Sequence, residues 1–480
     1  MIAQIVSCVC TFPLIVPIIV VLFLVGLYLQ KIYSFWETRG VQGPKPTWII
    51  GNMYARLRAT HSMAEFDQML YKNHGGKTFC GYYEFTQPCL MVGDPELLKH
   101  IMVKDFDHFT DRSFVTFNEP VMDHMLLGLK GGMWKAVRSV MTPTFSSGKI
   151  KQTLQLVKDC AKNLITYFDK ELEKRSSVFE MKEVYGMFTM DTIASIAFGV
   201  NSDSLNSTQN EFSQAAASFF KPPPKWKRPF IFFQFLWPQI AKYLCLNVID
   251  RTPIYFFTKV VSDTMKYRLQ NNLRRNDFLQ LLLDARLQEQ TNNNKGSESA
   301  DLSSKKVTNQ GTYIVRDVDL SLGLSGLDYI TGLMLGLERQ EESKSSSRCM
   351  LTDLVITAQC VLFYMAGYDT TATTLSFLSY CLALHPDIQQ KCMQEIETVL
   401  EKHEGEITYE AIMEMTYLDM VFAGMRFALM EAKVAIVYLL QEFAFIPSKK
   451  TQVPLIIEKR SGLLKAQDGV WVRLAKRITE

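Results

Sequence analysis

The segment Ala366-Gly367-Tyr368-Asp369-Thr370-Thr371 lies at the centre of a long apolar stretch, residues 352–385, which Pro386 terminates. At 1.5 Å per residue this stretch predicts one helix about 50 Å long. A glycine in a helix interior costs about 1 kcal/mol relative to alanine, and an acid in apolar surroundings is costly unless it is hydrogen-bonded or functional. The segment therefore indicates either helix packing with a satisfied acid, or a site where a flat group lies against Gly367 while Asp369 and Thr370 transfer protons.

Similar helical patterns precede this stretch. In residues 64–72, 149–174 and 180–199, apolar residues recur at spacings of three and four. This spacing is typical of helices that pack on a core. Strand signals are few, the clearest being residues 77–83 with 89–92 and residues 453–458 with 470–474. The second pair is interrupted by Asp468-Gly469, a hairpin-type turn. The sequence predicts a mainly α body with small β-sheets.

The N-terminal stretch has the properties of a membrane anchor. Residues 1–30 carry no charge, and residues 12–29 are almost wholly apolar, close to the roughly 20 residues that span a bilayer. A cleaved signal peptide would need a basic start, a shorter apolar core and small residues at a cleavage point. We therefore predict a single transmembrane helix in residues 1–30. Because Lys31, Arg39 and Lys45 follow it, the positive-inside rule places the body in the cytoplasm.

The remaining chain divides by composition. Gly43, Pro44 and Pro46 make residues 31–47 a stiff linker, and residues 48–480 form one globular domain. Within residues 287–350 we expect a disordered excursion, since residues 287–311 are rich in Asn, Ser, Lys and Gln and lack aromatic residues. The apolar, glycine-containing residues 313–340 that follow are an insert without an assigned role.

Residues 219–246 contain three consecutive prolines at 222–224. Aromatic and basic side chains alternate in the part that follows these prolines. Such a mixture suits a surface that dips into the headgroup region of a membrane. A loop followed by a core helix would have the same composition. Both interpretations stay open at this point.

Charge and metal-ligating residues exclude several classes of protein. Lys and Arg number 52 against 49 Asp and Glu, a net charge of +3 without a long basic run, so nucleic acid is not an expected partner. The ten cysteines form no CxxC pair and the seven histidines no HExxH motif, so neither a zinc site, a histidine metal site nor a disulfide framework is predicted. The last cysteine is Cys392.

Ala366–Thr371 as a string resembles the AGxDTT segment in the distal helix of the cytochrome P450 family, the heme-thiolate monooxygenases. Trp134-Lys135-Ala136-Val137-Arg138 resembles the WxxxR helix of that family, whose Trp and Arg bond a heme propionate, and an Arg fork suits a carboxylate. Further segments agree in order, namely residues 109–112, 143–146 and 197–199. The similarity runs from about residue 43 to 417 and resumes at Gly424, and it is closest in character to the microsomal, xenobiotic-metabolising animal branch.

The resemblance implies a P450 fold on the endoplasmic reticulum membrane, single-pass, with a cytoplasmic body. It implies insertion of oxygen from O2 into a lipophilic small molecule, with heme as the cofactor and NADPH electrons delivered by a P450 reductase. Asp369 and Thr370 would relay protons. The residues expected by resemblance to contact the heme are Trp134, Arg138, Arg112, Ala366, Gly367 and Gly424.

The chain departs from the family pattern after Phe422. The pattern continues with a Glu-x-x-Arg helix, a Pro-Glu-Arg-Phe-like segment and a Phe-x-x-Gly-x-Arg-x-Cys-x-Gly loop, whereas this chain passes directly to Gly424-Met425-Arg426. In register, Phe422 stands where the thiolate belongs, and a phenyl ring has no lone pair for iron. Cys360 and Cys381 lie on the predicted distal helix, on the wrong side of any heme that Gly367 faces. We predict an incomplete proximal half, no metal ligand and no activity as a monooxygenase.

Three alternatives remain. The chain could be a membrane-bound, catalytically inactive paralogue or splice product that binds lipophilic ligands or the reductase. It could be a gene-model or splicing product that never accumulates. A third hypothesis is a protein with a second span at residues 355–377, although Asp369 and six threonines in or near that stretch count against it.

Overall fold

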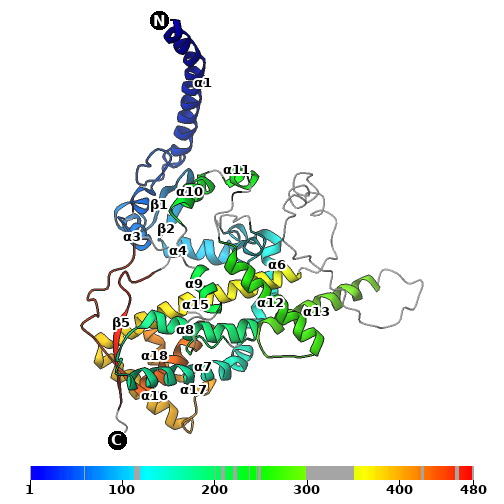
Figure 1. Cartoon of the computed structure of the whole chain (residues 1–480), viewed down its shortest axis with the longest axis vertical. Coiled ribbons are helices and arrows are strands. Elements are labelled where there is room, and N and C mark those ends of the chain that lie inside the picture. Colours follow the sequence, from blue (N-terminus) through cyan, green and yellow to red (C-terminus); the bar gives the residue numbers. More distant parts are fainter. Residues whose placement is uncertain are drawn as a thin grey trace.

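The computed structural model describes residues 2–58, 60–112, 119–200, 202–206, 211–219, 224–236, 238–244, 246, 250–298, 351–422, 426–459 and 464–477. Figure 1 shows a mainly helical body from which one long N-terminal helix projects. The helices are α1 (Ile2–Tyr33), α2 (Tyr54–Leu57), α3 (Met63–Asn73), α4 (Pro95–Lys99), α5 (Pro120–Asp123), α6 (Gly131–Met141), α7 (Ser147–Glu173), α8 (Met181–Ile193), α9 (Glu211–Phe219), α10 (Arg228–Leu236), α11 (Pro238–Tyr243), α12 (Thr252–Asn271), α13 (Phe278–Glu298), α15 (Asp353–Leu384), α16 (Pro386–Lys402), α17 (Tyr409–Glu414), α18 (Thr416–Val421) and α19 (Arg426–Glu442).

Helix α15 is the central element of the body, and its predicted extent is confirmed. The Thr352 side chain accepts a hydrogen bond from the backbone N–H of Val355 and caps the first turn. The helix ends before Pro386, which opens α16. Two apolar clusters meet on α15, one formed with α7, α8, α16 and α19 and the other with α6, α12 and α13. This central position is incompatible with a second membrane span at residues 355–377.

The other predicted helices are also found, with one correction. Residues 64–72, 149–174 and 180–199 correspond to α3, α7 and α8, the last continued by a short π-helix, Ala194–Phe198. Disorder was expected from residue 287, but α13 extends to Glu298. Gln288, Glu289 and Gln290 are good helix formers, whereas the asparagines and the glycine that follow them are poor ones, so propensity accounts only for the start of this extension. Residues 299–350, including most of the expected excursion and the insert, lie outside the described residues.

Two small sheets complete the fold. Strands β1 (Phe79–Glu84) and β2 (Gln87–Val92) correspond to the predicted strands 77–83 and 89–92, and they form an antiparallel hairpin. The second sheet has the order β3-β5-β4, in which β5 (Trp471–Lys476) lies between β3 (Val178–Glu180) and β4 (Phe443–Ile446). The prediction that residues 453–458 pair with this last strand is wrong. Pro454 cannot donate to a ladder, and only the isolated bridge Ile457 to Ala466 forms there.

Helix α1 is long and apolar enough to cross a membrane. The candidate span is Val16–Arg39, with a mean hydropathy of 2.0, and it is the one such helix within the described ranges. Most side chains of residues 16–28 are exposed, among them Leu22 and Phe23, each 64% exposed. In Figure 1 α1 projects from the end of the body that carries β1 and β2.

Candidate functional site

The centre of α15 presents two faces to different surroundings. Ala366, Thr370 and Thr374 follow one another at intervals of four and share one face, on which Ala366 and Thr370 are exposed. Gly367 and Asp369 contact α8 instead. The structure therefore does not bring Asp369 and Thr370 together into one site.

Gly367 lies where α15 and α8 approach closely. A Cβ atom on Gly367 would lie 2.4 Å from Cδ1 of Ile193, inside van der Waals contact. A side chain at position 367 would therefore displace the Ile193 side chain. This packing role accounts for the glycine that the sequence alone associated with a flat ligand, and its role toward heme stays a prediction.

Asp369 forms an ion pair between the same two helices. Its Oδ1 lies 2.9 Å from Nζ of Lys182 on α8, and the side chains are 13% and 20% exposed, respectively. The pair satisfies the acid in an otherwise apolar helix. Lys182 was missed by the sequence analysis, because nothing in its local pattern distinguishes it from an ordinary surface lysine.

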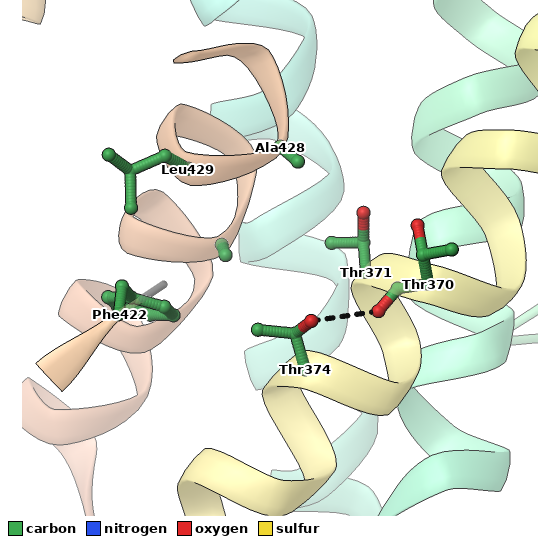
Figure 2. Close-up of a pocket in the computed structure, with 7 residues that line it drawn as sticks. Thr370, Thr371, Thr374, Phe422, Ala428 and Leu429 are labelled. Atoms are coloured by element: carbon green, nitrogen blue, oxygen red, sulfur yellow. Dashed lines mark hydrogen bonds between the residues drawn. The ribbon is translucent and has the colours of Figure 1, made fainter. Parts of the chain in front are cut away.

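The threonine hydroxyls of this segment donate to the helix backbone. Thr370 Oγ1 donates to the Ala366 carbonyl at 2.5 Å, and Thr374 Oγ1 donates to the Thr370 carbonyl at 2.9 Å, as Figure 2 shows for the second bond. Thr373 Oγ1 donates in the same way to the Asp369 carbonyl at 2.7 Å. Each of these hydroxyls is therefore engaged within its own helix.

A small pocket lies between α15 and α19. Figure 2 shows the threonines on one side and Phe422 with α19 on the other. Its volume is about 40 Å³, and its lining residues are Thr370, Thr371, Thr374, Phe422, Ala428, Leu429 and Ala432. A cavity of this size holds a few water molecules, whereas pockets that enclose a drug-sized ligand measure roughly 300–1,000 Å³. Phe422, which is 8% exposed, thus forms a wall opposite the Thr370 face.

The residues around this pocket do not fit a thiolate-ligated heme. The described residues that line it include no cysteine, and in the described part of the chain no cluster of His, Cys, Asp or Glu could hold a metal ion. Cys360 is fully buried on α15, where burial raises the pKa of its thiol and keeps it protonated. Cys381 is exposed on the same helix.

Three of the other predicted heme contacts do not line this pocket. Trp134 and Arg138 stand on α6, the first half-buried against Phe106 at a ring distance of 5.9 Å and the second exposed. Arg112 is exposed as well. Gly424 lies outside the described residues. Trp134, Arg138 and Arg112 are not among the residues that line the pocket, and the contact of all four residues with heme stays a prediction.

Two charged residues buried in α19 were not anticipated. Lys433 is fully buried and donates to the carbonyls of Ile412 and Met415 at 2.9 and 3.0 Å. Its Nζ also lies 2.5 Å from Asp419 Oδ1, although that oxygen accepts no well-aligned hydrogen bond. Lys433 therefore connects α19 to the segments on the other side of the 422–424 junction.

Glu431, two residues earlier, has no such partner. It is fully buried, and neither carboxyl oxygen has a hydrogen-bond partner in the described part of the chain. Burial raises the pKa of this carboxyl well above its usual range. The signal that could have identified both residues is their position inside the apolar run of 427–440.

Comparisons with known proteins identify the relatives of this chain. The profile of the family described as Cytochrome P450 matches residues 41–313 and 322–423. The match includes residues of the expected excursion and of the insert, and it ends at residue 423, directly after Phe422. The similarity inferred beyond Gly424 lies outside it.

Individual relatives agree with the profile. Probable cytochrome P450 6a14 of Drosophila melanogaster is 28% identical, with 93% of this chain and 96% of that protein covered. Cytochrome P450 9e2 of Blattella germanica is 27% identical, covering 96% of this chain and 97% of the relative. Cytochrome P450 3A25 of Mus musculus is 32% identical, and the alignment covers 86% of this chain and 69% of that protein.

The length of these alignments is informative. The alignment to the Drosophila relative runs over 539 positions, 59 more than the 480 residues of this chain. At least that many internal positions are therefore occupied by the relative alone. A match that covers most of the chain, even with internal positions missing, indicates common descent. The chain therefore belongs to the cytochrome P450 family.

Proposed function

We propose that this chain is a membrane-anchored, non-catalytic member of the cytochrome P450 family. Active members use heme and electrons that a reductase takes from NADPH to insert oxygen from O2 into lipophilic small molecules. This chain has the family's central helix but lacks the Cys loop that supplies the axial ligand. Without that ligand the chain would not carry out the family reaction.

One observation carries this proposal. Phe422 stands where the family's thiolate belongs, and it lines a pocket of about 40 Å³ with α19 and the Thr370 face of α15, whose described lining offers iron no thiolate. Because Thr370 and Asp369 point to different surroundings, the two residues expected to transfer protons also do not converge. The end of the family match at residue 423 supports the same conclusion.

Reconstituted turnover tests the proposal. The purified full chain in liposomes, supplied with P450 reductase, NADPH and a panel of lipophilic substrates, is expected to form no oxygenated product. A complete family member in the same liposomes provides the positive control. Product formation by the unaltered chain at a rate above that of reductase alone would contradict the proposal.

A splicing or gene-model origin is the alternative explanation of the missing segment. Sequencing of transcripts across the codons for Phe422 and Gly424 separates the two cases. Abundant transcripts with this junction support an inactive protein that accumulates. Transcripts that always contain an intervening Glu-x-x-Arg and Cys segment would reject the chain as a natural product.

We also propose that α1 anchors the chain in the endoplasmic reticulum membrane with the body in the cytoplasm. The uncharged span followed by Lys31 supports this orientation. Protease added to intact microsomes is therefore expected to digest the body. Protection of the body until detergent is added would show the opposite orientation.

A further inference from the structure

The joint between α1 and the body is closely packed. Tyr83 of β1 donates its hydroxyl hydrogen to the Tyr33 carbonyl at 2.8 Å and accepts the Trp36 N–H at 3.2 Å. Trp36 Nε1 donates to the Tyr82 carbonyl at 3.1 Å. The rings of Tyr33 and Tyr83 meet edge to face at 5.1 Å. These contacts fix the end of α1 on the hairpin β1–β2.

Glycines permit this close approach. A Cβ on Gly81 would lie 2.4 Å from Cγ of Trp36, and a Cβ on Gly43 would lie 1.8 Å from the Gly81 carbonyl oxygen. The Gly81 N–H also donates to the Gln42 carbonyl at 2.9 Å. The segment following α1 is therefore held against β1 rather than acting as a free tether.

A tight turn, residues 47–51, projects from this joint. Thr47 and Gly51 exchange two backbone hydrogen bonds of 2.8 Å, so that Trp48, Ile49 and Ile50 form the tip. The turn is fixed to β1 through Asn52, whose N–H donates to the Tyr83 carbonyl at 2.9 Å and whose Oδ1 accepts the Tyr83 N–H at 2.8 Å. The tip thus has a defined position relative to α1.

The tip exposes apolar side chains beside the candidate span. Trp48 is 66% exposed and Ile49 is 43% exposed. The Trp48 ring lies against Gly26 of α1, 3.7 Å from where a Cβ would stand. Gly26 precedes the first charged residue, Lys31, by five residues, or about 7 Å along the helix. Trp48 therefore lies on the apolar side of the first charge, at the depth of the membrane interface.

The backbone at the tip is strained. Ile49 has a φ of 66°, a left-handed conformation that is rare for a β-branched residue. Strain of this kind persists where the surrounding structure imposes it, and it is concentrated at functional positions. Here the strain directs an isoleucine outward next to an exposed tryptophan.

We propose that the turn 47–51 is a second lipid-contacting element, which inserts Trp48 and Ile49 into the interfacial region of the bilayer that α1 crosses. The inference rests on the proposed anchoring by α1. Tryptophan prefers the membrane interface, where its ring is apolar and its N–H meets water. The rigid joint holds the tip at this depth and so fixes how the body is oriented on the membrane.

Fluorescence quenching by brominated lipids tests the inference. The full chain, which has six tryptophans, is reconstituted in phosphatidylcholine liposomes containing lipids brominated either near the headgroup end or near the methyl end of the acyl chain. Trp48→Phe is expected to remove a component quenched most by the shallow bromines. Trp471→Phe, on β5 at a distance from α1 in Figure 1, is expected to leave that component intact.

A second variant tests the apolar tip without removing the fluorophore. Asparagine tolerates the left-handed conformation, so Ile49→Asn is expected to preserve the turn and to reduce quenching of Trp48 by shallow bromines. Leu273→Asn, at a position that is 48% exposed after α12, is expected to have no effect on quenching.

The outcomes separate the two proposals. Equal quenching of the unaltered chain and Trp48→Phe, in liposomes with which the chain floats, would overturn the inference and leave the anchoring intact. A chain that does not float with the liposomes would overturn both.

Discussion

The reduced, CO-treated chain is expected to show no thiolate-type Soret band, and Phe422→Cys alone is expected not to restore one. One sulfur at position 422 would add a ligand, but it would replace neither the Glu-x-x-Arg helix nor the loop that surrounds the Cys in the family pattern. A cofactor that binds only the folded state stabilises it by RT ln(1 + [L]/Kd), so the loss of axial ligation also removes that stabilisation. The measurement is the reduced CO difference spectrum of both proteins after expression with a heme precursor.

A third protein provides the decisive comparison. It carries a family-like Glu-x-x-Arg and Cys segment inserted between Phe422 and Gly424, and we expect it to show the thiolate-type band. The thermal midpoint of this restored chain is expected to rise when heme is supplied, whereas that of the unaltered chain is not. A thiolate-type band in the unaltered chain would mean that one of its ten cysteines ligates iron, and the non-catalytic proposal would then be wrong.

Glu431→Met is expected to increase the free energy of unfolding by about 1–3 kcal/mol at neutral pH, the usual cost of a buried polar group without a partner. Glu431 is fully buried in α19, and in the described residues its carboxyl oxygens have no hydrogen-bond partner. Methionine fills a similar volume without a polar group to desolvate. Denaturant titration in detergent measures the difference.

The pH dependence of the same variant follows from the raised pKa of Glu431. The unfolded carboxyl titrates near pH 4.3, and the folded chain retains the proton to higher pH. The contribution of the Glu431 carboxyl to the free energy of unfolding is therefore fully present below about pH 4.3, and it is lost as pH rises through the folded pKa. As pH rises from about 4.3 toward the folded pKa, the free energy of unfolding of the unaltered protein should therefore fall relative to that of Glu431→Met.

The control is Glu442→Met, at an exposed position near the end of the same helix. It is expected to change the free energy of unfolding by less than about 0.5 kcal/mol. If Glu431→Met instead destabilises the protein, the carboxyl has a favourable partner, and the interpretation of Glu431 as an unsatisfied acid fails.

Elements defined by local signals were predictable from the sequence. The periodicity of α15, its Thr352 cap and the proline after it specify one helix regardless of its neighbours. The hairpin β1–β2 likewise depends on residues close in the chain. The pairing of β5 with β3 and β4 was not predictable, because it joins segments that are distant in sequence and have no local signal for one another.

The candidate site was only partly predictable for the same reason. The sequence singled out Gly367, Asp369 and Phe422, but their surroundings come from α8 and α19. Ile193 accounts for the glycine, and Lys182 accounts for the acid. These partners become visible only when the helices are placed in space.

The central position of β5 has a consequence for synthesis of the protein. Strand β3 is complete at residue 180, yet its partner β5 begins at residue 471, so the ribosome must add nearly all of the remaining body before the sheet can close. At about 5–20 residues per second, this interval lasts roughly 15–60 seconds. During that time α1 would already be in the membrane while the edge of β3 is unpaired. The three-stranded sheet is therefore among the last parts of the body that can form, after translation reaches β5.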